Sequence, residues 1–502
     1  MKTNKILGVL LNYTLAVVDV LVALFFIPFL LSKLGDSNYG VYKLMQSTAS
    51  YLSVLDFGIG STITRYIVKY KVEKKDKKQE NFLAMALLIY AVLALSIVFI
   101  SIVIMIAIPS IYSKSLDPTV YSEAQKVFLV ICMTTAVSLF NHAYNGLMVA
   151  YEKFALSSGL SIIKIILRVG MIIVGLNIFN SPLTIVIVDF IAELLLLTTS
   201  ILYARISLNC RPKLYSWDWP LAREAFVFTL AIFVQSIINQ FNTNLDNIVL
   251  GIYTTTAVIS MYSIVLQIYT LYSTIATSIS TVYLPSISSK VFEKKSDEEI
   301  TDSIIFPSRI QLILLLLVFV GFILLGRDFI SLWLNRDGYQ DVYVLTCILL
   351  GASTLELSQT TITSVLKAKN ILRGRSIILS VSTVINAIIT VLLVPKFGAL
   401  GAVLGTAFSL VFGYGIALSV YYKKAAHLNM KRFYYKVYFP TVPVALVALA
   451  VGYFIINQMK MYGIIGFLLK GFVVLIIYCV FVFLFVLNDS EKRSILGRIS
   501  NG

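Results

Sequence analysis

The sequence predicts an all-α membrane protein with about fourteen spanning helices. Apolar blocks of spanning length recur from Ile6 to Leu487, and about 20 apolar residues are enough for a helix to cross a bilayer. Of the 502 residues, 58% are hydrophobic and 13% are charged, with a mean hydropathy of +0.88. This composition excludes an ordinary water-soluble domain.

The apolar blocks define the order of the helices along the chain. We expect spans at 6–31, 40–68, 82–108, 123–150, 154–178, 182–204, 222–250, 256–285, 303–326, 340–366, 375–395, 398–422, 436–457 and 463–488. The first block follows Lys2 and Lys5, as a signal peptide would, but it is too long and has no small-residue cleavage site. We therefore expect it to be retained as the first helix.

The distribution of lysine and arginine predicts the orientation. Basic residues gather in every second connector, as in 69–78 and 423–436, whereas the alternate connectors hold few. The positive-inside rule then places both termini in the cytoplasm, for a protein of the inner or plasma membrane. The net charge of +16 reflects this bias and some attraction to anionic lipid, so we expect membrane lipid and no nucleic acid as a partner.

Weak internal similarity predicts two related lobes. Leu34-Gly35 and Leu250-Gly251, and likewise Cys132 and Cys347, recur at a nearly constant offset. A six-helix repeat keeps its orientation, so the lobes are expected to be related by a pseudo-two-fold axis along the membrane normal. The predicted parts are an N-terminal lobe at 1–215, a C-terminal lobe at 216–427, and helices thirteen and fourteen with the tail at 428–502.

Polar residues on one face of two consecutive spans predict a substrate cavity, because a polar group facing lipid is costly. On the seventh span these are Gln235, Asn239, Asn242 and Asp246, and on the eighth Ser263, Gln267, Thr270, Thr274, Thr277 and Thr281. Hydrogen bonds between helices also explain such rows. We prefer the cavity because both spans carry a row.

Charged residues within spans supply further candidates. Asp19 and Glu356 are carboxylates inside apolar helices and are our candidates for ion coupling, although a structural hydrogen bond also explains Glu356. Arg65, near a helix end, either snorkels to the interface or holds a phosphate at the mouth of the cavity.

Two pairs of charges fall at matching depths on the fifth and sixth spans. Lys164 faces Glu193 and Arg168 faces Asp189 when both helices are counted from their cytoplasmic ends. Structural ion pairs that join the two helices are the preferred interpretation, and presentation of charge to an anionic substrate is the alternative.

The stretches Leu34–Tyr42 and Leu55–Tyr66, with the 6 + 6 + 2 helix pattern, resemble the polysaccharide-transporter branch of the multidrug/oligosaccharidyl-lipid/polysaccharide exporter superfamily. This resemblance implies a two-lobed, V-shaped transporter with a cavity lined by helices one, two, seven and eight. It further implies a flippase for undecaprenyl-diphosphate-linked oligosaccharide, such as an O-antigen or capsule repeat unit. The chain departs from a common flippase pattern because Thr281 stands at the repeat position of Arg65.

The expected function is therefore transport by alternating access, driven by an ion gradient or the membrane potential. A proton or sodium ion and polysaccharide assembly proteins are possible partners. A multidrug or toxin exporter of the same superfamily is the alternative. No P-loop, metal-ligand spacing or catalytic motif occurs, and every connector is short, so we expect no cofactor, no metal and no enzymatic activity.

Overall fold

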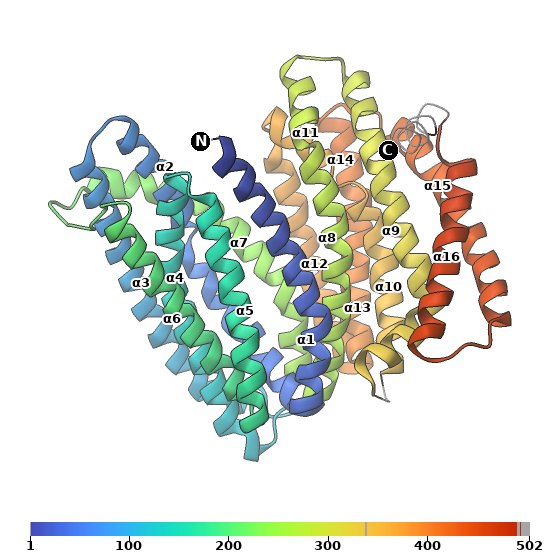
Figure 1. Cartoon of the computed structure of the whole chain (residues 1–502), viewed down its shortest axis with the longest axis horizontal. Coiled ribbons are helices and arrows are strands. Elements are labelled where there is room, and N and C mark those ends of the chain that lie inside the picture. Colours follow the sequence, from blue (N-terminus) through green and yellow to red (C-terminus); the bar gives the residue numbers. More distant parts are fainter. Residues whose placement is uncertain (1, 337–338, 489–491, 493–502) are drawn as a thin grey trace. The chain divides into compact units, whose positions relative to one another are not determined.

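The computed structural model describes the backbone of residues 2–336, 339–488 and 492, and side chains there except at 2–10, 12, 13, 16, 221, 225–232, 234 and 235. Within these ranges the chain is helical and has no β-strand (Figure 1). The first half contains α1 (Lys2–Ser50), η1 (Tyr51–Asp56), α2 (Ile59–Val72), α3 (Asp76–Ile111), η2 (Pro118–Val120), α4 (Tyr121–Ala150), α5 (Phe154–Ile178), α6 (Pro182–Ile206) and α7 (Trp219–Tyr253). The second half contains α8 (Thr256–Phe292), α9 (Asp297–Leu334), α10 (Gln340–Leu357), α11 (Ile362–Lys369), α12 (Leu372–Phe397), α13 (Ala399–Phe408), the π-helix η3 (Ser409–Ala417), α14 (Leu418–Ala425), α15 (Met430–Gln458) and α16 (Gly463–Phe485).

Twelve helices among the described residues are long and apolar enough to cross a membrane, which makes this a multi-pass membrane protein. One of these segments, Val17–Val72, has 56 residues and includes the second half of the first predicted span and all of the second. A single crossing needs about 20 residues, so this segment is long enough for two. α7 coincides with the seventh predicted span. The all-α class is therefore confirmed, with an approximate count of helices.

Backbone breaks divide the first long segment. Gly35 has φ 76° and ψ 171°, a conformation that residues with a Cβ rarely adopt, and it kinks α1. Phe57 and Gly58 have φ values of 52° and 68°, and they separate η1 from α2. Glycine thus occupies two of the three positive-φ positions at these breaks, and Phe57 occupies the third.

Local sequence signals explain several helix ends. Ser181 accepts a hydrogen bond from the backbone N–H of Leu183, and Pro182 is the first residue of α6. Ser296 and Glu299 form a reciprocal capping box at the start of α9. The Asn429 side chain caps α15 by accepting from the N–H of Arg432. These caps satisfy donors that the first helical turn leaves unpaired.

The chain forms two compact units, Met1–Ser263 and Ile264–Gly502. In the first, α4 packs on α3 and α6, α1 packs on α5, and α7 contacts α1 and η1. In the second, α12 packs on α13, and α15 and α16 both pack on α9. α7 belongs to the first unit because it packs against α1, and α15 and α16 belong to the second. The predicted lobe boundaries at 215 and 427 stay a prediction.

Candidate functional site

A cavity of about 380 Å³ in the first unit brings together five charged residues predicted from the sequence. α1 contributes Asp19, α5 contributes Lys164 and Arg168, and α6 contributes Asp189 and Glu193. The hydroxyl side chains of Thr134 on α4 and Ser161 on α5 complete the polar lining. The cavity is thus a charged site within a helical unit of a membrane protein, where such groups are costly without partners.

The four charges on α5 and α6 form the two pairs expected from their depth. The Lys164 ammonium bonds to the Glu193 carboxylate. Arg168 donates from Nε to one oxygen of Asp189 and from Nη2 to the other, at 3.1 Å, in the bidentate geometry that guanidinium favours. Glu193 also accepts from Asn141 Nδ2 at 2.6 Å. The pairs join adjacent helices and still line the cavity, with side chains of Lys164 and Arg168 26–28% exposed.

Asp19 is an exposed carboxylate in the same cavity. Among the described side chains, none donates a hydrogen bond or forms an ion pair to it. The four neighbouring charges are paired with one another, so Asp19 adds a further negative charge to the lining. A cation or a proton is the ligand that such a carboxylate can take.

The other residues predicted in the first unit have different surroundings. Asp246 on α7 is 5% exposed and accepts a hydrogen bond from Tyr262 on α8, so its carboxylate is part of the packing. The prediction that Asp246 lines a substrate cavity stays a prediction. Asn239 is exposed and Asn242 is half-buried, whereas the Gln235 side chain lies outside the described residues.

Arg65 lies on the exposed surface of α2, with its guanidinium carbon 5.8 Å from the centre of the Tyr66 ring. It does not line the cavity of the first unit. Its predicted contact with a phosphate stays a prediction, as does the alternative of snorkelling.

A second cavity, of about 400 Å³, lies in the second unit and is rich in hydroxyl groups. α8 contributes Thr277 and Thr281 from the predicted row, and Glu356, Thr360 and Thr363 come from the end of α10 to α11. Lys367 on α11 and Arg375 on α12 supply the positive charges. Two residues of the row on α8, Thr277 and Thr281, therefore line the same cavity as the Glu356 carboxylate on α10.

The threonines of α8 satisfy their hydroxyl protons within their own helix. Thr270, Thr274, Thr277 and Thr281 each donate to the carbonyl four residues earlier, at 2.7–3.2 Å. These bonds lie within one helix, unlike the interhelical bonds of the alternative interpretation. The oxygen atoms remain able to accept from a ligand. Gln267 is half-buried and Ser263 is buried, so the part of the row nearest the start of α8 is packed.

Gln311 on α9 holds the break between α10 and α11 against α8. Its side-chain amide is fully buried and donates to the carbonyl of Ala276 at 2.8 Å and to Thr360 Oγ1 at 2.9 Å. Thr361 donates back to Gln311 Oε1 at 2.7 Å. The break itself is held by short-range bonds such as Gln359 N to Glu356 O. An interrupted helix inside a membrane protein is tolerated where it lines a cavity.

The cationic residues of the second cavity were not found from the sequence as site residues. Lys367 and Arg375 looked like ordinary basic residues of a cytoplasmic connector. The Arg375 Nε is buried and has no hydrogen-bond acceptor among the described residues, and Arg375 lies within electrostatic range of Glu356. Only the position of this connector beside α8 and α10 identifies it as part of the cavity.

A polar cluster in the first unit was also missed. Tyr90 on α3 donates to Asp56 Oδ1 at 2.6 Å, and His142 Nδ1 on α4 lies 3.3 Å from Asp56 Oδ2. No partner near His142 in the sequence predicts this contact. The cluster ties α3 and α4 to the residue just before the break at Phe57 and Gly58.

Comparison with known proteins identifies the family. Residues 7–291 match the family described as polysaccharide biosynthesis protein. The chain is 24% identical over 395 residues to a probable flippase, AglR, of Haloferax volcanii, covering 77% of this chain and 76% of that protein. Both matches come from the amino-acid sequence, so they do not depend on the geometry of the cavities.

Solved structures share the fold. The lipid II flippase MurJ in an inward closed conformation superposes with a TM-score of 0.73 at 18% identity, covering 95% of this chain and 98% of that one. An inward-facing multidrug resistance MATE transporter gives 0.59 at 14% identity, covering 81% and 99%. The resemblance to the polysaccharide-transporter branch of the exporter superfamily is therefore confirmed, and this chain belongs to the polysaccharide biosynthesis protein family.

Proposed function

We propose that this protein is a flippase that moves an undecaprenyl-diphosphate-linked oligosaccharide repeat unit from the cytoplasmic to the outer leaflet by alternating access. An ion gradient or the membrane potential would supply the driving force. The family match, the probable flippase among its relatives and the fold shared with a lipid II flippase support a flippase-type transporter rather than an enzyme.

The observation that carries the proposal is the difference in lining between the two cavities. In the second unit, two cations and one carboxylate stand among threonine and serine hydroxyls. In the first unit, two cations face three carboxylates. A hydroxyl-rich lining with excess positive charge suits a sugar diphosphate, and a lining with excess negative charge suits a small coupling cation.

The residues of the second cavity can replace water around the polar headgroup. The charged and hydroxylated head of a lipid-linked sugar cannot enter hydrocarbon, because each unpaired polar group costs several kcal/mol. Lys367 and Arg375 can hold phosphate oxygens, while the hydroxyls of Thr277, Thr281 and Thr363 can bond to sugar hydroxyls. The lipid tail would stay in the membrane. Arg65 remains a further candidate for a phosphate contact.

Asp19 is our main candidate for coupling. It is exposed in a cavity where the other four charges are already paired, so gain or loss of one cation changes the net charge of the lining. Glu356 is the second candidate, although its neighbour Arg375 favours an electrostatic role in the second cavity. The sequence has no P-loop, so we expect a driving force other than the hydrolysis of a bound nucleotide.

A multidrug cation exporter of the same superfamily is the second candidate function. The specific observation in its favour is the net negative lining of the first cavity, which could accept an organic cation in place of a coupling ion. The two functions differ in the sign of the charge on the transported molecule, and this difference decides the experiment.

The test is transport in proteoliposomes that contain the purified full-length protein. A fluorescent undecaprenyl-diphosphate oligosaccharide is incorporated during reconstitution, and the fraction exposed in each leaflet is followed with a membrane-impermeant quencher after a proton or sodium gradient is imposed. The proposal expects gradient-dependent movement of this lipid between leaflets. Movement of an organic dye cation without movement of the lipid would favour the exporter.

Two variants on one helix sharpen this test. Arg375→Gln changes a residue of the second cavity, and Arg373→Gln removes the same charge from an exposed position two residues away. The proposal expects at least a tenfold slower rate for the first and a rate near wild type for the second. Equal rates would remove the second cavity from the transport path.

A further inference from the structure

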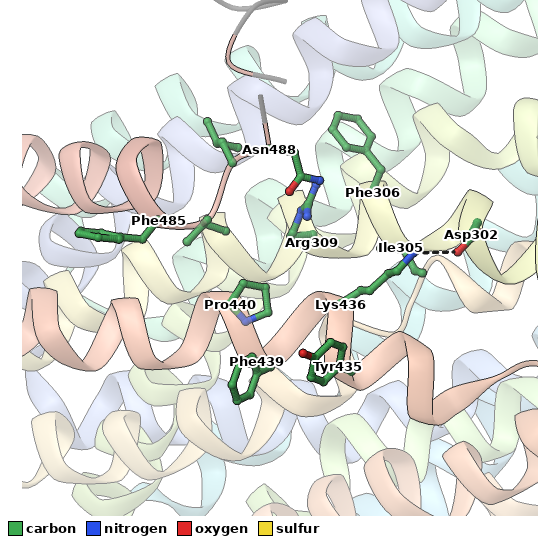
Figure 2. Close-up of a pocket in the computed structure, with 12 residues that line it drawn as sticks. Asp302, Ile305, Phe306, Arg309, Tyr435, Lys436, Phe439, Pro440, Phe485 and Asn488 are labelled. Carbon is green, nitrogen blue, oxygen red and sulfur yellow. Dashed lines mark ion pairs between the residues drawn. The ribbon is translucent and has the colours of Figure 1, made fainter. Parts of the chain in front are cut away.

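A third cavity, of about 470 Å³, lies in the second unit and is separate from the hydroxyl-rich cavity described above. It is formed by the first turns of α9, the first turns of α15, and the end of α16 with the residues after it. Figure 2 shows Arg309, Lys436 and Asp302 along one part of its wall and Phe439, Pro440 and Phe485 along another. Neither the proposed binding of substrate nor the proposed coupling to a cation uses this cavity.

The polar part of this cavity contains two cations and one carboxylate. Arg309 is 7% exposed, so most of its side chain is buried among the surrounding helices, and it also lines the cavity. The Lys436 side chain is 45% exposed, and its Nζ lies 3.5 Å from Asp302 Oδ1. Lys436 is therefore accessible to a ligand, and it makes only a long contact with its carboxylate.

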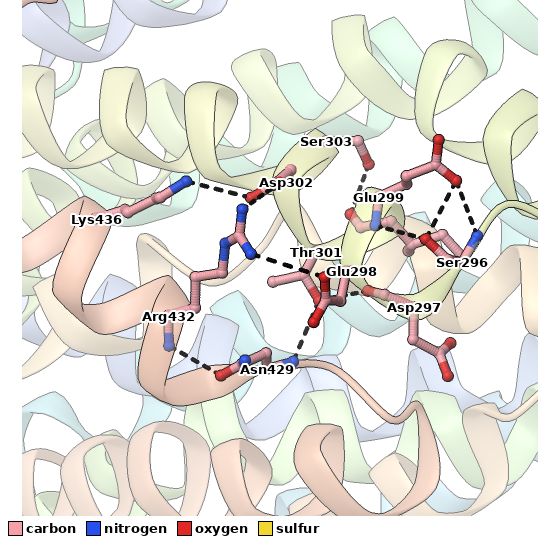
Figure 3. A network of polar contacts seen from close by, with 11 residues as sticks. Ser296, Asp297, Glu298, Glu299, Thr301, Asp302, Ser303, Asn429, Arg432 and Lys436 are labelled. Carbon is pink, nitrogen blue, oxygen red and sulfur yellow. Dashed lines mark hydrogen bonds and ion pairs between the residues drawn. The ribbon is translucent and has the colours of Figure 1, made fainter.

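Asp302 is already engaged by a second cation. Arg432 Nη2 lies 2.6 Å from Asp302 Oδ2, and Arg432 Nη1 lies 4.0 Å from Glu298 (Figure 3). The start of α15 is also held to α9 by the Asn429 N–H, which donates to Thr301 Oγ1 at 3.2 Å. Because one carboxylate is shared by Arg432 and Lys436, it cannot fully neutralise both. These contacts hold the start of α15 against α9, and the cations of the cavity outnumber its one carboxylate.

The apolar part of the cavity is open to the surroundings. Tyr435, Phe439 and Phe485 are 66%, 67% and 63% exposed. On membrane-spanning helices such large exposed side chains face lipid. The lining therefore changes from the cationic Lys436 to the apolar Phe439 and Pro440 within about one turn of α15.

The cavity also lies near the ends of the helices that form it. It lies at the helix ends that the distribution of lysine and arginine predicts to be cytoplasmic, where the headgroups of anionic lipids would be found. A basic pocket between helices on the cytoplasmic side is typical of binding sites for anionic lipid headgroups. A lining that joins cations to exposed aromatic side chains has the same amphipathic arrangement as a phospholipid.

The geometry points to a binding site for one anionic phospholipid of the surrounding membrane, with its phosphate on Arg309 and Lys436 and its acyl chains along Phe439 and Phe485. A free phosphate would use the cations and leave the aromatic wall uncovered. The bound lipid would connect the start of α15 to the end of α16 and to α9. This site is distinct from the proposed transport path, so it stands whether or not the protein is a flippase.

The test is native mass spectrometry of the full-length protein in detergent, titrated with phosphatidylglycerol or with phosphatidylcholine. Wild type is expected to retain one phosphatidylglycerol and to prefer it over phosphatidylcholine. Lys436→Gln should lower the affinity for phosphatidylglycerol about fivefold. Arg309→Gln should lower it further. Lys431→Gln, which removes the same charge from an exposed position of α15 outside the cavity, should bind as wild type does.

Three results would overturn the assignment. The first is equal binding of the two phospholipids, or binding that neither Arg309→Gln nor Lys436→Gln changes. The second is displacement of phosphatidylglycerol by inorganic phosphate alone, which would mean that the aromatic wall plays no part. The third is a preference for undecaprenyl phosphate that is lost in the same variants. If Arg309→Gln does not fold, the exposed Lys436 still decides the outcome.

Discussion

Arg168 on α5 contacts both carboxylate oxygens of Asp189 on α6, and its Nη2 lies 3.1 Å from Oδ2. Both side chains are about one quarter exposed. Arginine supplies two parallel donors here, whereas lysine would supply a single point of charge. The pair therefore fixes the relative position of two neighbouring helices and at the same time lines the cavity that holds Asp19.

Removal of Arg168 is expected to destabilise the first unit. Arg168→Gln leaves the Asp189 carboxylate partly buried without its partner, which should lower the free energy of unfolding by on the order of 3 kcal/mol. Arg168→Lys should cost less because the charge remains. Thermal unfolding in detergent measures both. Lys126→Gln, an exposed change on α4, is the control and should stay within about 0.5 kcal/mol. An unchanged melting temperature in Arg168→Gln would contradict a structural role for the pair.

A side chain at Gly40 is expected to destabilise the protein. A Cβ added there would lie 1.9 Å from the carbonyl oxygen of Thr256, where α1 approaches the start of α8, and Ser37 bonds to the same threonine at 3.0 Å. Gly40→Ala should therefore cost roughly 1–3 kcal/mol of stability by overpacking. At Gly170 a Cβ meets nothing within 4 Å, so Gly170→Ala should melt at the wild-type temperature or above it. The same melting temperature for the two variants would show that the close approach is not required.

Gln311 is expected to be essential for the break between α10 and α11. Gln311→Met keeps the volume but removes the bonds to Ala276 and Thr360 and leaves the Thr361 hydroxyl without its acceptor. The expected loss is about 1–3 kcal/mol for the unsatisfied buried groups. Gln340→Met, at an exposed position on α10, provides the matched control in the same thermal unfolding assay. A stability of Gln311→Met that equals that of the control would be the contradicting result.

Asp19→Asn is expected to separate substrate binding from coupling. The variant removes the carboxylate proposed to take the coupling cation, while the residues of the second cavity are unchanged. Gradient-driven movement of the lipid-linked oligosaccharide should fall by at least tenfold, with little change in its binding. Asp117→Asn, in an exposed connector, should transport as wild type does. Full gradient-driven transport by Asp19→Asn would exclude this carboxylate from coupling.

Hydropathy predicted the fold well because the bilayer leaves few choices. A spanning segment must satisfy its own backbone hydrogen bonds, so long apolar blocks become helices. The pairing of Lys164 with Glu193 and of Arg168 with Asp189 followed from helical rise alone, since adjacent helices with a short connector are antiparallel. The breaks at Phe57 and between Leu357 and Ile362 fall inside the predicted spans 40–68 and 340–366, because the hydropathy of a whole span does not reveal a short polar stretch such as 358–361.

The candidate sites were less accessible to sequence reasoning because they depend on packing between distant segments. Helical periodicity selected Thr277 and Thr281, which line a cavity, and Asp246, which is buried and accepts from Tyr262, without distinguishing these two surroundings. Lys367 and Arg375 were attributed to the charge bias of a connector. The contact of His142 with Asp56 could not be predicted, because the two residues lie far apart in the sequence.

The most direct measurement is deletion of the gene in its native host, followed by a leaflet-resolved assay of undecaprenyl-linked sugar. Complementation is with wild type, Arg375→Gln or Arg373→Gln at equal expression. A flippase predicts that lipid-linked repeat units accumulate in the cytoplasmic leaflet of the deletion strain and of the Arg375→Gln strain, and that wild type and Arg373→Gln restore them to the outer leaflet. Normal surface polysaccharide in the deletion strain, with altered sensitivity to cationic drugs, would contradict the flippase and favour the multidrug exporter.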